Sequence, residues 1–203
     1  LNPLGEMVQV DGAEMCVYSE GQGEKTLVFM SGSGTCSPIL DFRSLYSSLS
    51  DTYKIAVVEK FGYGFSDITD KSRDIDTILE NTRTALDKAG LEAPYILCPH
   101  SMSGIEALYW AQKYPDEVSA IIGLDMSVPE AYEELKLNPF LMQILRFGAN
   151  IGITRIGSFS ESAAIQGGTL TEEEKEIYRA VFFTRTMTND MINEAANIKD
   201  GAA

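Results

Sequence analysis

The chain has 203 residues, 44% of them hydrophobic, and a formal net charge of −14. This length and composition suit one soluble α/β-sized domain, and no run of 18 apolar residues is present that could span a membrane. The negative charge argues against nucleic acid or anionic lipid as a partner, because such a surface repels phosphate groups.

The three cysteines are Cys16, Cys36 and Cys98, an odd number with no C-x-x-C spacing. Free thiols fit this pattern better than a disulfide framework, and we expect no metal site. Free thiols favour a cytoplasmic location, while an extracytoplasmic protein with a removed leader stays open.

The first part of the chain alternates strand and helix signals. A hairpin is expected at Asp11-Gly12 between the first two strands, and Gly90 ends a helix of clear apolar periodicity. The helix that begins at Pro38 has Ser37 as its expected N-cap. In chain order the expected elements are strands 6–10, 14–21 and 25–30, helix 38–49, strand 53–60, helix 75–89, strand 95–99, helix 102–114 and strand 118–125.

The later strands are apolar runs rather than alternating patterns, which is typical of parallel strands covered by helices on both faces. After residue 129 strand signals vanish. Helices are expected over 138–148, after a capping box formed by Thr171 and Glu174, and over 188–198. The sequence therefore predicts an α/β core over 1–129, with a mostly parallel sheet, and a helical cap over 130–203.

The stretch "PHSMSG" (99–104) lies between an apolar strand and a helix. Small residues two before and two after a nucleophile allow the sharp strand-to-helix turn that exposes it, and Pro99 and Ser103 occupy these positions. Ser101 is therefore the predicted nucleophile. A serine hydroxyl needs a base to take its proton before it can attack a carbonyl carbon.

Acyl transfer also needs donors for the oxyanion. The N–H of Met102, directly after the nucleophile, is one expected donor. The N–H of Ser33, in the glycine-rich loop 31–34, is the other, although an ordinary Gly/Ser turn is the alternative reading of that loop.

With these motifs the chain resembles the α/β-hydrolases of the serine esterase, lipase and peptidase type. Its oxyanion loop resembles H-G-x-G with Ser31 in place of His, and a later loop resembles D-x-x-G-x-G-x-S with Glu59 in place of Asp. The resemblance covers residues 6–125 and rests on "VFMSGSGTCSP", "VVEKFGYGFSD", "PHSMSG" and "YWAQKYPDEVSAIIGLD". It implies an α/β-hydrolase fold with a helical cap inserted after the sixth strand.

The chain contains one histidine, His100. It corresponds to the histidine that precedes the family's nucleophile and is not the triad base, because neighbouring side chains on a sharp elbow point apart. The family's triad runs Ser, acid, His, and the last two usually follow strands not visible here. The resemblance thus implies that the base and roughly 60 or more further residues lie outside this sequence. Asp125 is a candidate acid, with turn capping as the alternative.

The function expected from the resemblance is hydrolysis of an ester, thioester or amide of a small, largely apolar substrate through an acyl-enzyme, with no cofactor. The alternative is a non-catalytic binder of a small ligand on the same scaffold. Strand 118–125 would be an apolar sheet edge, so the rest of the polypeptide or a second copy is expected to pair with it. The cap residues expected to cover the site are Leu141, Ile144, Leu145, Phe147, Phe182 and Phe183.

Overall fold

The computed structural model describes residues 1–69, 71–133, 144, 147–148, 163–166 and 168–201. Its centre is a sheet in the order β1-β2-β4-β3-β5-β6, with β7 also paired to β5. The first two strands are antiparallel and the others are parallel. The strands are β1 (Glu6–Val10), β2 (Ala13–Glu20), β3 (Thr26–Met30), β4 (Lys54–Glu59), β5 (Tyr95–Ser101), β6 (Val118–Ile121) and β7 (Leu124–Met126).

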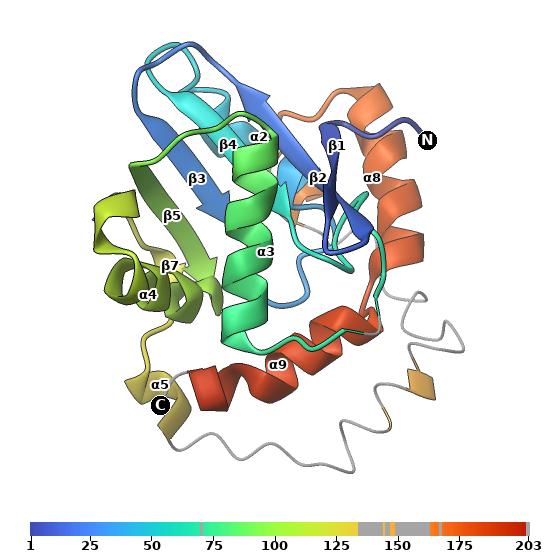
Figure 1. The fold of residues 1–203 in the computed structure, drawn as a ribbon. Coiled ribbons are helices and arrows are strands. Elements are labelled where there is room, and N and C mark those ends of the chain that lie inside the picture. Colours follow the sequence, from blue (N-terminus) through green and yellow to red (C-terminus); the bar gives the residue numbers. More distant parts are fainter. Residues whose placement is uncertain (70, 134–143, 145–146, 149–162, 167, 202–203) are drawn as a thin grey trace.

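Helices cover both faces of this sheet, and α3 and α4 lie in front of it in Figure 1. Helix α9 runs past the ends at which β3 and β5 stop, and it contacts α3 and α4. The helices are α1 (Pro38–Asp41), α2 (Arg43–Tyr46), α3 (Ile75–Lys88), α4 (Ser103–Lys113), α5 (Glu130–Glu133), α7 (Ala163–Gln166), α8 (Glu172–Arg185) and α9 (Asn189–Gly201), and a 3-10 turn spans Pro115–Glu117. This arrangement confirms the predicted α/β fold class.

The core lies in two layers because successive side chains of a strand point to opposite faces. In β3, Val28 and Met30 belong to the cluster that also contains Trp110 of α4. Leu27 and Phe29 belong to the cluster on the other face. A strand buried on both sides explains the continuous apolar runs in the sequence.

The expected single helix over 38–49 is wrong. The structure has two one-turn helices separated at Phe42, and the Ser37 side chain makes no capping hydrogen bond. Instead, the Ser37 N–H donates to the Asp41 carboxylate at 3.3 Å. Leu40, Phe42 and Tyr46, from both sides of this interruption, are all buried.

The expected strand 118–125 is also divided. β6 ends at Ile121, and β7 begins at Leu124, and both pair with β5. Gly123 lies in the break, where a Cβ atom would lie 2.7 Å from Met126 Cγ. The outer side of β6 pairs with no other strand in the described part of the chain.

The capping box at Thr171 and Glu174 is confirmed and begins α8. The helix expected over 188–198 is present as α9. The helix expected over 138–148 lies outside the described residues except at positions 144, 147 and 148.

Candidate active site

Ser101 closes β5 and has a φ of +53°, in the left-handed region that residues other than glycine rarely adopt. Such a conformation costs roughly 1–3 kcal/mol and persists only where surrounding structure imposes it. The chain turns directly into α4, which packs so closely that a Cβ atom on Gly104 would lie 2.1 Å from the Ser127 carbonyl oxygen. The local geometry is a strained strand-to-helix elbow with a serine at its tip.

Ser103 holds this elbow together. Its hydroxyl accepts a hydrogen bond from the His100 N–H at 2.9 Å and lies 2.8 Å from the Met30 carbonyl oxygen, which can accept its proton. The side chain is completely buried. The sequence indicated only that this residue had to be small, so its role as a link between β3 and the elbow was missed.

The glycine-rich loop after β3 lies directly against the candidate nucleophile. A Cβ atom on Gly32 would lie 2.7 Å from Ser101 Cβ and 3.3 Å from Ser101 Oγ. In the described part of the chain, the backbone N–H groups of Ser33 and Met102 donate to no backbone carbonyl outside the helices and strands. The role of both N–H groups as oxyanion donors stays a prediction.

His100 and Asp125 are the other two residues singled out by sequence. The His100 ring packs edge-on against Phe42, with ring centroids 6.2 Å apart, and no described hydrogen bond joins it to Ser101. Asp125 is exposed on β7, next to Met126, which pairs with Ser101. Its carboxylate contacts no described hydrogen-bond donor, so its role as the triad acid also stays a prediction.

A buried ionic cluster lies beneath the oxyanion loop. Lys60 donates to the Glu106 carboxylate at 2.7 Å, to the Glu194 carboxylate and to the Ser31 carbonyl oxygen at 3.2 Å. All three charged side chains are at least 95% buried. Burial raises the pKa of Glu106 to about 7, against the opposing effect of the Lys60 ammonium.

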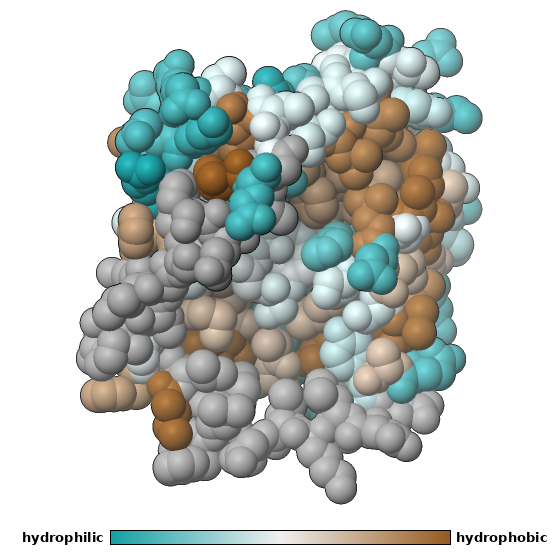
Figure 2. All heavy atoms as spheres, turned by 180° about the vertical axis from the view of Figure 1, so that it is seen from behind, coloured by the Kyte–Doolittle hydropathy of each residue, from teal (hydrophilic) through white to brown (hydrophobic). Residues whose placement is uncertain are grey.

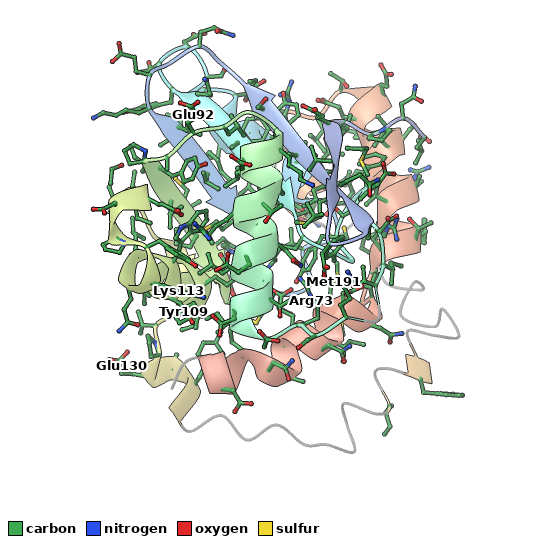
Figure 3. All side chains as sticks on the ribbon, in the orientation of Figure 1. Arg73, Glu92, Tyr109, Lys113, Glu130 and Met191 are labelled. Atoms are coloured by element: carbon green, nitrogen blue, oxygen red, sulfur yellow. The ribbon has the colours of Figure 1, made fainter. Side chains whose placement is uncertain are left out.

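Arg73 extends the cluster to the start of α9. Its guanidinium lies 3.9 Å from Asp190 and 3.8 Å from Glu194, and it is 1% exposed. Asp190 also accepts hydrogen bonds from the N–H and hydroxyl of Thr69, at 2.8 and 2.9 Å. Figure 3 shows Arg73 and Met191 together where the loop before α3 meets α9. Sequence reasoning missed this cluster because its members are far apart along the chain.

Glu59 is the last residue of β4, and its side chain packs against the loop that follows. Its carboxylate accepts the Phe65 N–H at 2.7 Å and lies so close to Gly64 that a Cβ atom there would be 1.9 Å from it. The side chain is fully buried, and burial raises its pKa to about 7. The glycine and the acid of this motif are thus explained by packing rather than by catalysis.

A cavity of about 600 Å³ adjoins the oxyanion loop on the side of α1 and α8. Its lining residues are Ser33, Gly34, Thr35, Cys36, Leu40, Asp41, Phe42, Ser44, His100, Gly168, Thr169, Leu170, Tyr178, Phe182 and Thr186. Ser101 is not a lining residue, although its neighbour His100 and the Ser33 loop are. The volume is in the range of small-molecule sites.

Only one of the six apolar cap residues predicted to cover the site, Phe182, lines this cavity among those the structure describes. Ile144, Phe147 and Phe183 are 49%, 66% and 42% exposed, and their role in covering the site stays a prediction. Their spacing indicated an amphipathic helix but could not show which surface its apolar side would meet. Leu141 and Leu145 lie outside the described residues.

One wall of the cavity carries a carboxylate that sequence reasoning did not single out. Asp41 accepts the Tyr178 hydroxyl at 2.9 Å, which links α1 to α8 across 137 residues. Burial raises the pKa of Asp41 to about 6, and the hydrogen bonds from Tyr178 and the Ser37 N–H oppose this shift. No Lys or Arg of the described chain forms an ion pair with Asp41; the nearby Arg43 pairs with Glu20 and Glu174.

In the part of the chain that the structure describes, no group of three or more His, Cys, Asp or Glu residues has metal-site geometry. None of the described helices is both long and apolar enough to cross a membrane. Cys16, Cys36 and Cys98 are all free and buried. The compartment in which the protein acts stays a prediction.

Comparison with known proteins agrees with this geometry. A family model described as alpha/beta hydrolase fold matches residues 25–147. The uncharacterized protein YbdG of Bacillus subtilis (strain 168) is 49% identical over 201 residues, which cover 96% of this chain and 61% of YbdG. A cis-3-alkyl-4-alkyloxetan-2-one decarboxylase of Shewanella oneidensis is 27% identical over 118 residues, covering 57% of this chain and 36% of that protein. The chain thus spans less than two thirds of the length of these relatives.

Two solved structures show the same fold at low sequence identity. Epoxide hydrolase A from Mycobacterium thermoresistibile superposes with a TM-score of 0.71 at 20% identity, covering 99% of this chain and 76% of that one. An esterase from Exiguobacterium antarcticum superposes with a TM-score of 0.67 at 17% identity, covering 97% and 74%.

Proposed function

Because the chain belongs to the α/β-hydrolase fold family, we propose that it carries the nucleophile and oxyanion loop of a serine hydrolase that cleaves esters, thioesters or amides. The observation that carries this proposal is Ser101, held at a φ of +53° between β5 and α4 and directly against Gly32. One fold hosts several chemistries, so the family alone does not select acyl transfer. A serine at the elbow, directly against a glycine-rich loop, does favour it.

In the proposed reaction, Ser101 Oγ attacks the substrate carbonyl carbon and the carbonyl oxygen becomes an oxyanion. The N–H groups of Ser33 and Met102 stabilise that oxyanion, and a single donor of this kind contributes about 3–4 kcal/mol to lowering the barrier. The acyl-enzyme is then hydrolysed by water. No cofactor takes part in the proposed steps.

The base that deprotonates Ser101 is proposed to be a histidine outside these 203 residues, since His100 packs on Phe42 instead. The same additional chain, rather than a second copy, is proposed to pair with the outer side of β6. Figure 2, seen from behind, shows apolar side chains gathered on the side that carries β5 and β7. Ile122 directly follows β6 and is 50% exposed. Its side chain would be covered in such an arrangement.

The test is covalent labelling with a fluorophosphonate, followed by peptide mass spectrometry, on the natural protein that contains this chain. Labelling confined to Ser101, together with loss of labelling in Ser101→Ala, is expected. The proposal would be contradicted if another residue were labelled, or if Ser101 were not labelled in a folded protein. The second outcome would favour the non-catalytic binder.

A further inference from the structure

We propose that the cavity beside the oxyanion loop binds a substrate that carries an organic cation, with the Asp41 carboxylate as its counter-charge. This inference rests on the proposed function, because it names the class of acyl group that Ser101 would receive. It goes beyond the sequence expectation of a largely apolar substrate.

The first argument is the position of Asp41. The carboxylate lines a cavity that also contains Ser33 of the oxyanion loop and His100, the neighbour of Ser101. A group bound against Asp41 is therefore in a cavity whose wall includes the neighbours of the proposed reaction centre, Ser33 and His100, although Ser101 itself does not line it.

The second argument is that none of the lysines and arginines in the described part of the chain pairs with Asp41. Asp41 forms no ion pair with any Lys or Arg that the structure describes, and its two hydrogen-bond donors are neutral groups, the Tyr178 hydroxyl and the Ser37 N–H. A partly buried carboxylate without a counter-charge is an unfavourable arrangement that a bound cation relieves. Burial raises the pKa of the Asp41 carboxyl to about 6, and a bound cation would favour its ionised form.

The third argument is the aromatic lining. Phe42, Tyr178 and Phe182 face the same cavity as the carboxylate. Aromatic faces attract cations through the ring quadrupole, and quaternary ammonium groups are commonly recognised in this way. A carboxylate together with aromatic rings binds an ammonium group better than either does alone, whereas it disfavours an anionic acyl chain. The net charge of −14 further attracts cations toward the protein.

The experiment compares two p-nitrophenyl esters of nearly equal shape, the ester of 4-trimethylammoniobutyrate and its neutral tert-butyl isostere. The readout is the ratio of their kcat/KM values in the natural protein. We expect the charged ester to be preferred, and Asp41→Asn to lower this ratio about tenfold. Asn keeps an oxygen that accepts the Tyr178 hydroxyl, so this variant changes charge more than shape.

Two further variants separate recognition from structure. Asp51→Asn makes the same charge change at an exposed turn before β4, at the other end of the sheet, and should leave the ratio unchanged. Tyr178→Phe removes the link to α8 but keeps the ring and the carboxylate, so the preference for the charged ester should persist. If Tyr178→Phe abolishes the preference while Asp41→Asn, which keeps the hydrogen bond, retains it, then Asp41 acts only through its link to α8 and the inference is overturned.

The outcomes also distinguish this inference from the proposed function. Turnover of the neutral ester that depends on Ser101, without any effect of Asp41→Asn on the ratio, overturns the cation site and leaves the hydrolase proposal intact. If neither ester is turned over, butyltrimethylammonium chloride is titrated calorimetrically. Binding that Asp41→Asn weakens about tenfold supports the site in a non-catalytic protein, and equal or no binding overturns it.

Discussion

The ammonium of Lys60 donates a hydrogen bond to the carbonyl oxygen of Ser31, at 3.2 Å, from inside a cluster of buried carboxylates. Ser31 begins the loop whose Gly32 lies against Ser101. The same ammonium binds Glu106 on α4 and Glu194 on α9. One buried charge therefore connects loop 31–34, the helix that follows Ser101 and a helix of the predicted cap.

Lys60→Met should destabilise the fold by about 3–5 kcal/mol, because it leaves two buried carboxylates without their shared cation. The loss should be larger at pH 8 than at pH 6, since without Lys60 the carboxylates fold most readily when protonated. Chemical denaturation at both pH values measures this. Lys25→Met, at an exposed lysine, is the matched control and should change stability by less than about 0.5 kcal/mol. Equal effects of the two variants would show that the cluster contributes nothing.

Ser101→Ala should abolish p-nitrophenyl ester hydrolysis in the natural protein while its circular dichroism spectrum stays unchanged. Loss of the nucleophile typically reduces kcat by about 10⁶-fold. Ser127→Ala, at the residue whose N–H donates to the Ser101 carbonyl oxygen, retains that N–H and should keep activity. Wild-type turnover by Ser101→Ala would refute the nucleophile assignment.

Ser33→Pro should lower kcat by roughly 10²–10³-fold, because proline lacks the N–H proposed to bind the oxyanion. Ser33→Ala keeps that N–H and should retain wild-type kcat, which isolates the backbone donor from the side chain. KM should change little in either variant. A similar kcat for the two variants, with the fold intact, would exclude Ser33 as a donor.

Glu59→Gln should flatten the dependence of stability on pH. The folded-state pKa of Glu59, about 7, is higher than its ordinary value of 4.5, so the folded protein binds this proton more tightly than the unfolded chain does. The free energy of unfolding therefore falls as pH rises from about 4.5 to 7, by on the order of 3 kcal/mol for this group. Glutamine remains uncharged and its oxygen can still accept the Phe65 N–H.

Denaturation between pH 4.5 and 8 checks this expectation: the variant should be more stable than the wild type at pH 8 and similar to it at pH 4.5. The wild-type slope also contains Glu106 and Asp41, whose pKa values are raised too. Only part of the slope should therefore disappear. Glu92→Gln, at an exposed glutamate labelled in Figure 3, should leave the slope as it is. An unchanged slope in Glu59→Gln would mean that its carboxyl is not buried in solution.

The sequence predicted the strands and the α/β fold well because their signals are local. Asp11 and Gly12 both have the positive φ values, 51° and 82°, that their hairpin turn requires. The elbow at Ser101 was located for a similar reason, since small residues at fixed spacing reflect close packing. The family match then confirmed the fold that these motifs indicated.

The parts that could not be predicted depend on contacts between distant residues. Neither Asp41 nor Tyr178 belongs to a motif, and their hydrogen bond spans 137 residues. The interruption between α1 and α2 falls at Phe42, where no glycine or proline indicates it in the sequence. The apolar residues at 144 and 147 followed a clear helical period, but periodicity does not show which surface a helix will contact.

Arg73 also has a consequence for how the protein is made. Its guanidinium is buried, and its ion-pair partners in the described chain, Asp190 and Glu194, are synthesised more than a hundred residues later. At a synthesis rate of about 5–20 residues per second, Asp190 and Glu194 are added to the chain several seconds after Arg73. The loop around Arg73 therefore cannot reach its native burial during early synthesis. A chain released before α9 is made would therefore lack both carboxylates that pair with Arg73.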